Sequence, residues 1–163
     1  MRFEIAPGIF TELPAGKEAE FLAAEKHKRE LNPLVGYFPH SKQKAFHSAN
    51  TSIKAFFGGN RSGKTHCAIA DDIIQAVDRE AVPDHLLPYK KWDAPFKCWI
   101  GCPKFPKLEE AILPKIRELT PKAQFLGGSF DKAYSKTDKL LRFQNGSTIG
   151  FKTYDQDVDA YSS

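Results

Sequence analysis

Apolar and polar residues follow two different periods along this chain, and the change of period separates neighbouring elements. KTHCAIADDIIQAVDR, residues 64–79, places Ile69, Ile73 and Val77 four residues apart, which is the spacing of one buried helix face. TSIKAFF, residues 51–57, is β-branched and aromatic and is followed by two glycines, which predicts a buried strand. A glycine-rich loop therefore joins a predicted strand directly to a predicted helix.

The other elements follow from the same patterns and from turn residues. They are an extended or looping arm over 1–16, a helix over 17–31 that Asn32 and Pro33 stop, a short helix capped by Ser41, a surface loop over 82–95, a second buried strand over 98–102, a helix over 108–119 that Pro114 ends or kinks, and a hairpin whose turn is Asn145-Gly146. Strand, helix, strand, helix and hairpin in this order predict an α/β layered fold.

Composition excludes several classes of protein. The chain has 163 residues, enough for one domain, and its 41% hydrophobic and 27% charged content is that of an ordinary globular protein. No apolar run approaches the roughly 20 residues that span a bilayer, and the start of the chain lacks the pattern of a secretion signal. We therefore expect a cytoplasmic protein with no membrane partner.

The three cysteines predict no disulfide framework. Cys67, Cys98 and Cys102 are too few and odd in number, so we expect reduced thiols. Cys98 and Cys102 resemble half of a zinc site, but neither a second pair nor a nearby histidine completes it.

The charge distribution permits contact with nucleic acid without arguing for it. The net charge is +4, from 24 basic and 20 acidic residues. A short middle stretch holds Lys90, Lys91, Lys97, Lys104 and Lys107. A solvated face and a track for DNA both account for this stretch.

The loop between the first predicted strand and its helix carries the strongest chemical signal. Gly58, Gly63, Lys64 and Thr65 match the phosphate-binding pattern G-x-x-x-x-G-K-[ST]. Glycines let the backbone approach phosphates closely, successive N–H groups converge on an anion, and the following helix adds the partial positive charge of its N-terminus. In this pattern Lys64 reaches the β- and γ-phosphates and the Thr65 hydroxyl binds Mg²⁺. The predicted ATP-binding residues of the loop are Gly58, Gly59, Asn60, Arg61, Ser62, Gly63, Lys64 and Thr65.

Several stretches together resemble the ATPase domain of phage large terminase subunits, which are the motors that pump DNA into viral capsids. They are YFPHSKQKAF (37–46), FFGGNRSGKT (56–65), CWIGCPKFPKLEEAILPKI (98–116) and LRFQNGSTIGFKTYDQ (141–156). The resemblance covers about 37–163 and is weaker over 1–36, which would form an N-terminal arm and helix. It implies a P-loop NTPase core of the RecA-like, terminase type.

The resemblance also implies cofactors, partners and residue roles. The cofactors would be ATP and Mg²⁺, and the partners double-stranded DNA, a portal protein, a small terminase subunit and further copies of the chain in a ring, all in the cytoplasm of the host cell. Gln43 would read the adenine base, and Arg61 would act with Lys64 on the γ-phosphate. The family often places this arginine one position earlier, where this chain has Asn60.

Other interpretations of these side chains stay open. Gln43 could be a solvated helix residue, and Arg61 a surface arginine beside the loop. The nearby aromatic residues Tyr37, Phe38 and Phe46 could stack on the base or belong to the core.

The acidic strand that such an ATPase needs is not found. After the hairpin the only carboxylates are Asp155, Asp157 and Asp159, which follow no apolar run and lack the glycine and glutamate of a calcium loop. We therefore expect a P-loop core that is incomplete at its C-terminal end, in an N-terminal part of a longer protein whose nuclease domain lies elsewhere. The strand over 51–57 would then be short of partners, and the chain would bind ATP weakly with negligible turnover.

Alternative functions share the loop. A helicase-like, DNA-stimulated ATPase also has an upstream glutamine. A P-loop kinase of a small molecule would add an arginine-rich lid, which is not recognisable here. A non-catalytic nucleotide-binding module fits the missing carboxylates.

Overall fold

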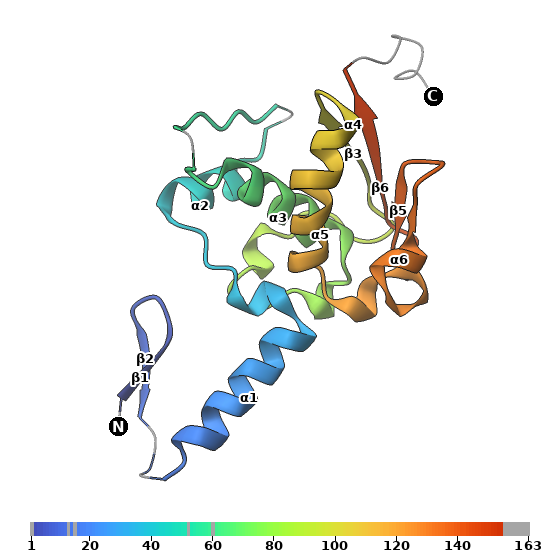
Figure 1. The fold of residues 1–163 in the computed structure, drawn as a ribbon. Coiled ribbons are helices and arrows are strands. Elements are labelled where there is room, and N and C mark those ends of the chain that lie inside the picture. The colour runs from blue at the N-terminus through green and yellow to red at the C-terminus, as the bar shows by residue number, and fades with distance from the viewer. Residues whose placement is uncertain (1, 13, 15, 52, 60, 155–163) are drawn as a thin grey trace.

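The computed structural model describes residues 2–12, 14, 16–51, 53–59 and 61–154, which form a mixed α/β fold (Figure 1). One sheet has two strands and the other has four, in the order β3-β6-β5-β4. No helix in these ranges is long and apolar enough to cross a membrane. The α/β class predicted from the sequence is confirmed at this level.

The N-terminal region differs from the predicted arm. Strands β1 (Arg2–Ala6) and β2 (Ile9–Glu12) pair antiparallel, and the Pro7-Gly8 dipeptide that suggested a loop is the hairpin turn between them, with Gly8 at φ 76°. Helix α1 (Glu18–Leu31) ends at Asn32 as predicted. It buries none of its own residues, and Figure 1 shows the hairpin and α1 projecting from the rest of the molecule.

The four-stranded sheet contains β3 (Lys97–Cys102), β4 (Tyr134–Ser135), β5 (Leu140–Arg142) and β6 (Thr148–Thr153). Strands β5 and β6 form the predicted hairpin, and β3 pairs parallel with β6. In the hairpin turn Gly146 takes a φ of 82°, whereas Asn145 uses its side chain to contact another element. Among the described residues β3 is an edge strand, and its Trp99 is 58% exposed, so its predicted full burial is wrong.

The helices of the body surround the apolar core. They are α2 (Ser41–Ser48), α3 (Lys64–Ala76), α4 (Phe105–Lys107), α5 (Leu113–Leu119) and α6 (Phe130–Ala133), with a π-helical turn over Leu108–Ile112 and 3-10 turns over Pro33–Gly36, Arg79–Ala81, Leu87–Tyr89, Lys122–Gln124 and Leu126–Gly128. Pro114 lies in the first turn of α5, directly after the π turn, because it has no N–H to donate to the preceding turn. The chain stays helical from Phe105 to Leu119, so Pro114 does not end the helix, and the helix changes from π to α at Leu113.

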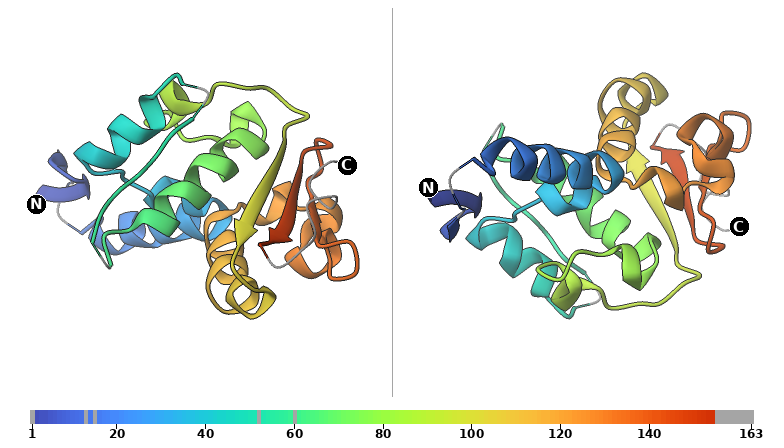
Figure 2. Two further views of the ribbon diagram at one scale, coloured as in Figure 1. Left: turned by 90° about the horizontal axis from the view of Figure 1, so that it is seen from above. Right: turned by 90° about the horizontal axis from the view of Figure 1, so that it is seen from below.

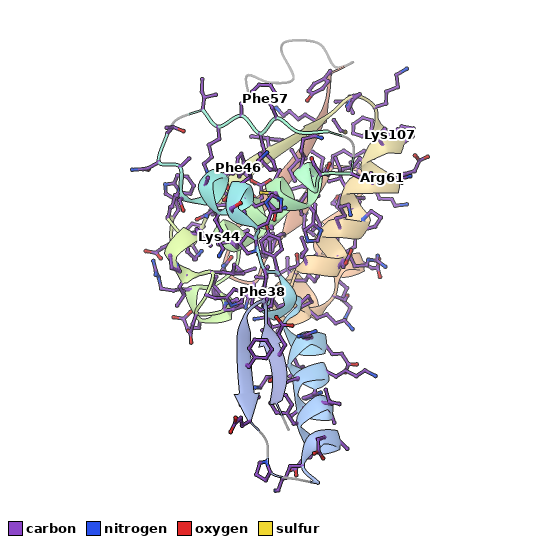
Figure 3. All side chains as sticks on the ribbon, turned by 90° about the vertical axis from the view of Figure 1, so that its left-hand side faces the viewer. Phe38, Lys44, Phe46, Phe57, Arg61 and Lys107 are labelled. Atoms are coloured by element: carbon purple, nitrogen blue, oxygen red, sulfur yellow. The ribbon has the colours of Figure 1, made fainter. Side chains whose placement is uncertain are left out.

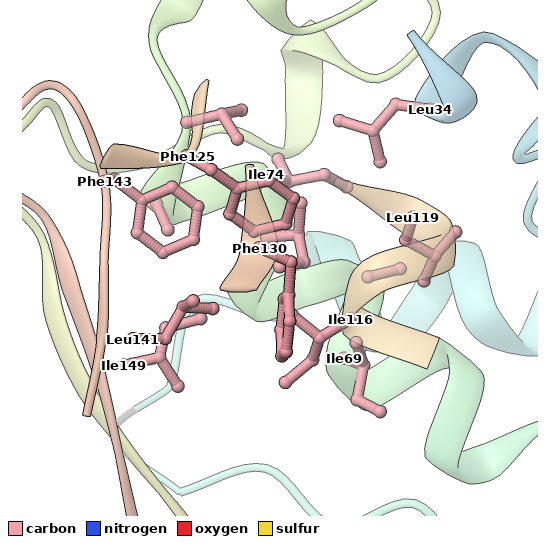
Figure 4. Packing of buried hydrophobic residues seen from close by; sticks show 14 of the residues in the cluster. Leu34, Ile69, Ile74, Ile116, Leu119, Phe125, Phe130, Leu141, Phe143 and Ile149 are labelled. Atoms are coloured by element: carbon pink, nitrogen blue, oxygen red, sulfur yellow. The ribbon is translucent and has the colours of Figure 1, made fainter. Parts of the chain in front are cut away.

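The core lies where α3 and α5 meet the sheet (Figure 4). Ile69 and Ile74 of α3 lie with Ile116 of α5 and Ile149 of β6, all less than 4% exposed. The predicted helix over 64–79 is thus confirmed in type and in its buried face, and it ends at Ala76. The predicted surface loop over 82–95 is partly wrong, because it contains a 3-10 turn and buries Val82, Leu86 and Lys90.

The strand predicted over 51–57 is wrong. The described residues of this segment, 51 and 53–57, are neither helix nor strand, and Ile53 and Phe57 are 87% and 89% exposed. Figure 2 shows the segment as an extended trace between α2 and α3, and Figure 3 shows Phe57 on its outer side. In the described part of the chain the sheet ends at β3, so this strand-forming sequence has no neighbour with which to pair.

Candidate functional site

The glycine-rich loop leads directly into the start of α3. Gly63 is the N-cap, with a left-handed backbone at φ 76°, and its carbonyl accepts a 2.9 Å hydrogen bond from the Cys67 N–H. Arg61 also has a positive φ of 62°. In the described residues no side chain caps the start of α3. The N–H groups of its first turn are therefore available to an anion, which the helix dipole also attracts.

Lys64 lies folded over this loop. Its Nζ donates to the carbonyl oxygens of Gly58 at 2.7 Å and Gly59 at 2.6 Å, and lies 3.4 Å from Ser62 Oγ. An ammonium group has three donors and no acceptor, so it can donate to phosphate oxygens in place of these carbonyl oxygens. The ammonium and the uncapped helix end together form a local site for a negatively charged group.

Gln43, the upstream glutamine that the resemblance predicts as the adenine-reading residue, lies beside the glycine-rich loop. It is 7% exposed, its Oε1 accepts from the His40 N–H at 3.0 Å, and its Nε2 lies 3.0 Å from the position that a Cβ on Gly63 would take. The solvated-helix alternative is therefore wrong. The cap prediction is wrong as well, since His40 is the N-cap of α2 and Ser41 is its first residue.

The aromatic residues near Gln43 pack against protein groups. Phe38 stacks on His85 with ring centroids 4.5 Å apart, and Phe46 contacts Phe56 at 5.6 Å. The Tyr37 hydroxyl bonds to His47. Tyr37 is buried in the core cluster, as the core interpretation requires. Phe38 and Phe46 are half-buried outside that cluster, and Phe46 lines the cavity beside the loop.

A cavity of about 940 Å³ adjoins the loop. Its floor is α3, and its walls are the extended segment 53–57 and the end of β3 with α4. Residues on its lining include Lys54, Phe56, Lys64, Thr65, Asp72 and Ile100. Burial, together with the neighbouring charge of Asp71, raises the pKa of Asp72 to about 7. The cavity is thus lined by a carboxyl group with a raised pKa, that of Asp72, which lies on the same helix as Lys64 and Thr65.

Arg61 lies on the other side of the loop. It is exposed and lines a cavity of about 450 Å³ together with Lys42, Phe57 and Ser62. The structure therefore brings together Gln43, Lys64 and the described glycines, with Arg61 at the rim. Asn60 lies outside the described residues, as do Asp155, Asp157 and Asp159.

A set of polar residues that was not predicted from the sequence lies behind the loop. Lys54 Nζ donates to Asp71 Oδ2 at 2.8 Å, and His47 Nδ1 lies 2.8 Å from Asp71 Oδ1. A signal was present in the sequence, because a lone lysine inside the apolar run TSIKAFF must find a partner or reach water.

Two further features of the sequence are the three cysteines and the lysine-rich stretch. Cys67, Cys98 and Cys102 are free thiols, and the described ranges contain no group of three or more potential metal-binding side chains from His, Cys, Asp and Glu. Lys90 is 6% exposed and donates to carbonyls of α3, so it belongs neither to a solvated face nor to a DNA track.

Comparisons with protein-family models, with curated proteins and with solved structures each found no match.

Proposed function

We propose that this chain is the ATP-binding part of a P-loop NTPase, of the type found in the large terminase subunits that package viral DNA. The observation that supports this most strongly is Lys64, whose ammonium lies on the Gly58 and Gly59 carbonyls at the uncapped start of α3. Lysine, glycines and helix terminus each favour phosphate for a separate physical reason. They stand together in the order that the phosphate-binding pattern requires.

The residues present fit the triphosphate of ATP with Mg²⁺. The loop N–H groups would hold the phosphate oxygens, Lys64 would neutralise charge between the β- and γ-phosphates, and the exposed Thr65 would offer its hydroxyl to the metal. Bound Mg²⁺ would supply charge neutralisation on the transferred phosphoryl group. Arg61, at the rim, has a long side chain with five donors that would reach the phosphates from the other side.

In the intact motor, ATP hydrolysis would drive double-stranded DNA into a capsid. The partners would be a portal protein, a small terminase subunit and further copies of the chain in a ring, in the host cytoplasm. The proposed DNA-packaging activity and these partners are supported by the sequence resemblance alone. A helicase-like ATPase is the alternative, and binding to a portal protein separates the two, because a helicase needs no portal.

We also propose that this chain alone turns ATP over negligibly. Asp72 and Glu110 are the acidic residues on the described lining of the cavity beside Thr65. Asp72 follows Thr65 by seven positions on α3, which is about 10 Å along the helix axis, too far for both to hold one metal ion directly. Turnover above about 1 s⁻¹, typical of an active ATPase, would contradict this proposal.

The binding test compares two lysine variants by calorimetric titration with ATP and Mg²⁺. Lys64→Ala removes a charge-assisted contact to phosphate, so we expect at least about tenfold weaker binding. Lys26→Ala is the matched control, because Lys26 is an exposed lysine on α1. Equal affinity of the Lys64→Ala variant and the unchanged chain would show that the loop is not the nucleotide site.

A further inference from the structure

A chain of hydrogen bonds links α2, α3 and the segment before the loop. The Tyr37 hydroxyl lies 2.8 Å from His47 Nε2, His47 Nδ1 lies 2.8 Å from Asp71 Oδ1, and Lys54 Nζ lies 2.8 Å from Asp71 Oδ2. The His47 side chain is fully buried, while those of Lys54 and Asp71 are 14% and 15% exposed. The chain therefore runs from the interior to the edge of the cavity.

The directions of these hydrogen bonds follow from the tautomer of His47: with the proton on Nδ1, which faces Asp71, Nε2 is the acceptor. Burial raises the pKa of Tyr37, so its hydroxyl stays protonated and donates to His47 Nε2. The Nδ1–H of His47 and the ammonium of Lys54 then donate to the two oxygens of Asp71. Burial alone would raise the pKa of Asp71, but hydrogen bonds from His47 and Lys54 outweigh it and lower that pKa. Asp71 is thereby held as a carboxylate.

The Lys54–Asp71 ion pair connects the two stems of the glycine-rich loop. Lys54 precedes Gly58 by four positions, a span of at most about 14 Å, and Asp71 follows Lys64 by seven, about 10 Å along the helix. The ion pair therefore closes the chain on itself just behind the loop. His47 anchors Asp71 to α2, the helix that also carries Gln43.

This connection matters because the stem before the loop has no sheet to hold it. Residues 53–57 alternate between exposed and half-buried as a strand would, with Lys54 and Phe56 facing inward, yet they have no strand partner in the described structure. Their inward contacts are the bond from Lys54 to Asp71, the Lys54 ammonium 5.0 Å from the Phe46 ring centroid, and the Phe46–Phe56 ring contact. Side-chain packing and one ion pair therefore hold residues 53–57 in place of backbone hydrogen bonds to a neighbouring strand.

We propose that Lys54 and Asp71, oriented by His47, are positioning residues that hold the glycine-rich loop in the form that binds phosphate. This inference rests on the proposed nucleotide-binding function. We call Lys54, Asp71 and His47 the clamp. Without the clamp the stem would leave α3 for part of the time, and the apparent affinity for ATP would fall in proportion to the fraction of time that the loop is competent to bind. A competent fraction of about 10–30% corresponds to roughly threefold to tenfold weaker binding.

The test separates positioning from general stability. Lys54→Met removes the link but leaves Asp71 without its ammonium, which can destabilise the fold by itself. The double variant Lys54→Met, Asp71→Asn removes that uncompensated charge, and the asparagine oxygen can still accept from His47. We expect the double variant to unfold near the temperature of the unchanged chain and to bind ATP with Mg²⁺ threefold to tenfold more weakly. Lys54→Arg keeps the ion pair and should restore the affinity.

The matched control lies at the other end of the same helix. Gln75 Nε2 donates to the Tyr89 carbonyl at 2.8 Å, and Gln75 Oε1 accepts from the Lys91 N–H at 2.8 Å. Gln75→Met should lower the unfolding temperature without changing ATP affinity. The inference is overturned if the double variant binds ATP like the unchanged chain, or if Gln75→Met weakens binding by the same factor. Failure of the unchanged chain to bind ATP, or unchanged binding by Lys64→Ala, would instead overturn the proposed function and the inference with it.

Discussion

The two ends of α3 differ in whether side chains satisfy their backbone polar groups. At its C-terminal end, Lys90 Nζ donates to the carbonyls of Ile74 at 3.2 Å and Gln75 at 2.9 Å, and Asn145 Nδ2 donates to the Ala76 carbonyl at 2.9 Å. At its N-terminal end the described residues provide no side-chain cap. One helix thus has a C-terminus closed by distant parts of its own chain and an N-terminus left with free donors.

This difference separates a structural end from a functional one. The C-terminal carbonyls of α3 lie in the interior, where unpaired polar groups are costly, so side chains from the hairpin and from Lys90 satisfy them. The N-terminal donors lie beside a cavity, where water or an anion can satisfy them. We expect substitutions at the closed end to change stability and substitutions at the open end to change ligand binding.

The largest effect on stability is expected at the closed end. Asn145→Ala leaves the Ala76 carbonyl and the Asp78 carboxylate without their 2.9 Å donor, and should cost about 1–3 kcal/mol of unfolding free energy. Urea denaturation measures this, with Gln144→Ala as the control, because Gln144 is the exposed neighbour. ATP affinity should stay the same. An Asn145→Ala variant as stable as Gln144→Ala would contradict a stabilising role for the hydrogen bonds at the C-terminal end of α3.

A somewhat smaller loss of stability is expected at the open end, together with a loss of binding. Gly63→Ala forces a side chain into a left-handed backbone, at a cost of about 1–2 kcal/mol, and brings the new Cβ to 3.0 Å from Gln43 Nε2. Gly128→Ala is the matched control, because Gly128 has a similar φ of 75° and nothing within 4 Å of a new Cβ. Both variants should lose comparable stability in urea, but only Gly63→Ala should lose ATP affinity. Equal affinity of the two variants would argue against a role for Gly63 in binding.

The smallest effect is expected at Asp72, and it depends on pH. Burial, with the charge of Asp71, raises the folded-state pKa of Asp72 to about 7, above the unfolded value of about 3.9. The folded chain therefore binds more protons between these values, and the stability that Asp72 allows at acidic pH is lost as pH rises through 7. Asp72→Asn should stabilise the fold at pH 8, where the buried carboxylate is charged, and by progressively less toward pH 4. Parallel stability profiles of the variant and the unchanged chain over this range would contradict the assignment.

Local signals in the sequence predicted the elements that depend on local packing. The four-residue spacing of Ile69 and Ile73 predicted α3, and Asn145-Gly146 predicted the hairpin. The strand prediction for 51–57 was wrong because a strand is stabilised by neighbouring strands that lie far away in sequence. Its β-branched and aromatic residues show that it could pair, but not whether a neighbouring strand is there.

The same distinction applies to the candidate site. The pattern over 58–65 is contiguous, so the loop was visible in the sequence, and the structure begins a helix at Lys64 as the pattern requires. The clamp behind it joins Asp71 to His47 across 24 positions and to Lys54 across 17. No short motif spans such distances, and a buried histidine on a short helix resembles any core residue.

The most direct test of the central claim follows the backbone N–H groups at the two ends of α3 by nuclear magnetic resonance. ATP with Mg²⁺ is titrated into the chain, and adenosine, which has no phosphates, serves as the control. We predict that ATP shifts the amide resonances of Gly63, Lys64 and Thr65 while those of Ala76 and Val77 stay in place, and that adenosine leaves the loop amides unchanged. Saturating ATP that leaves the loop amides unshifted, or that shifts only residues elsewhere, would contradict the claim that the open end of α3 binds phosphate.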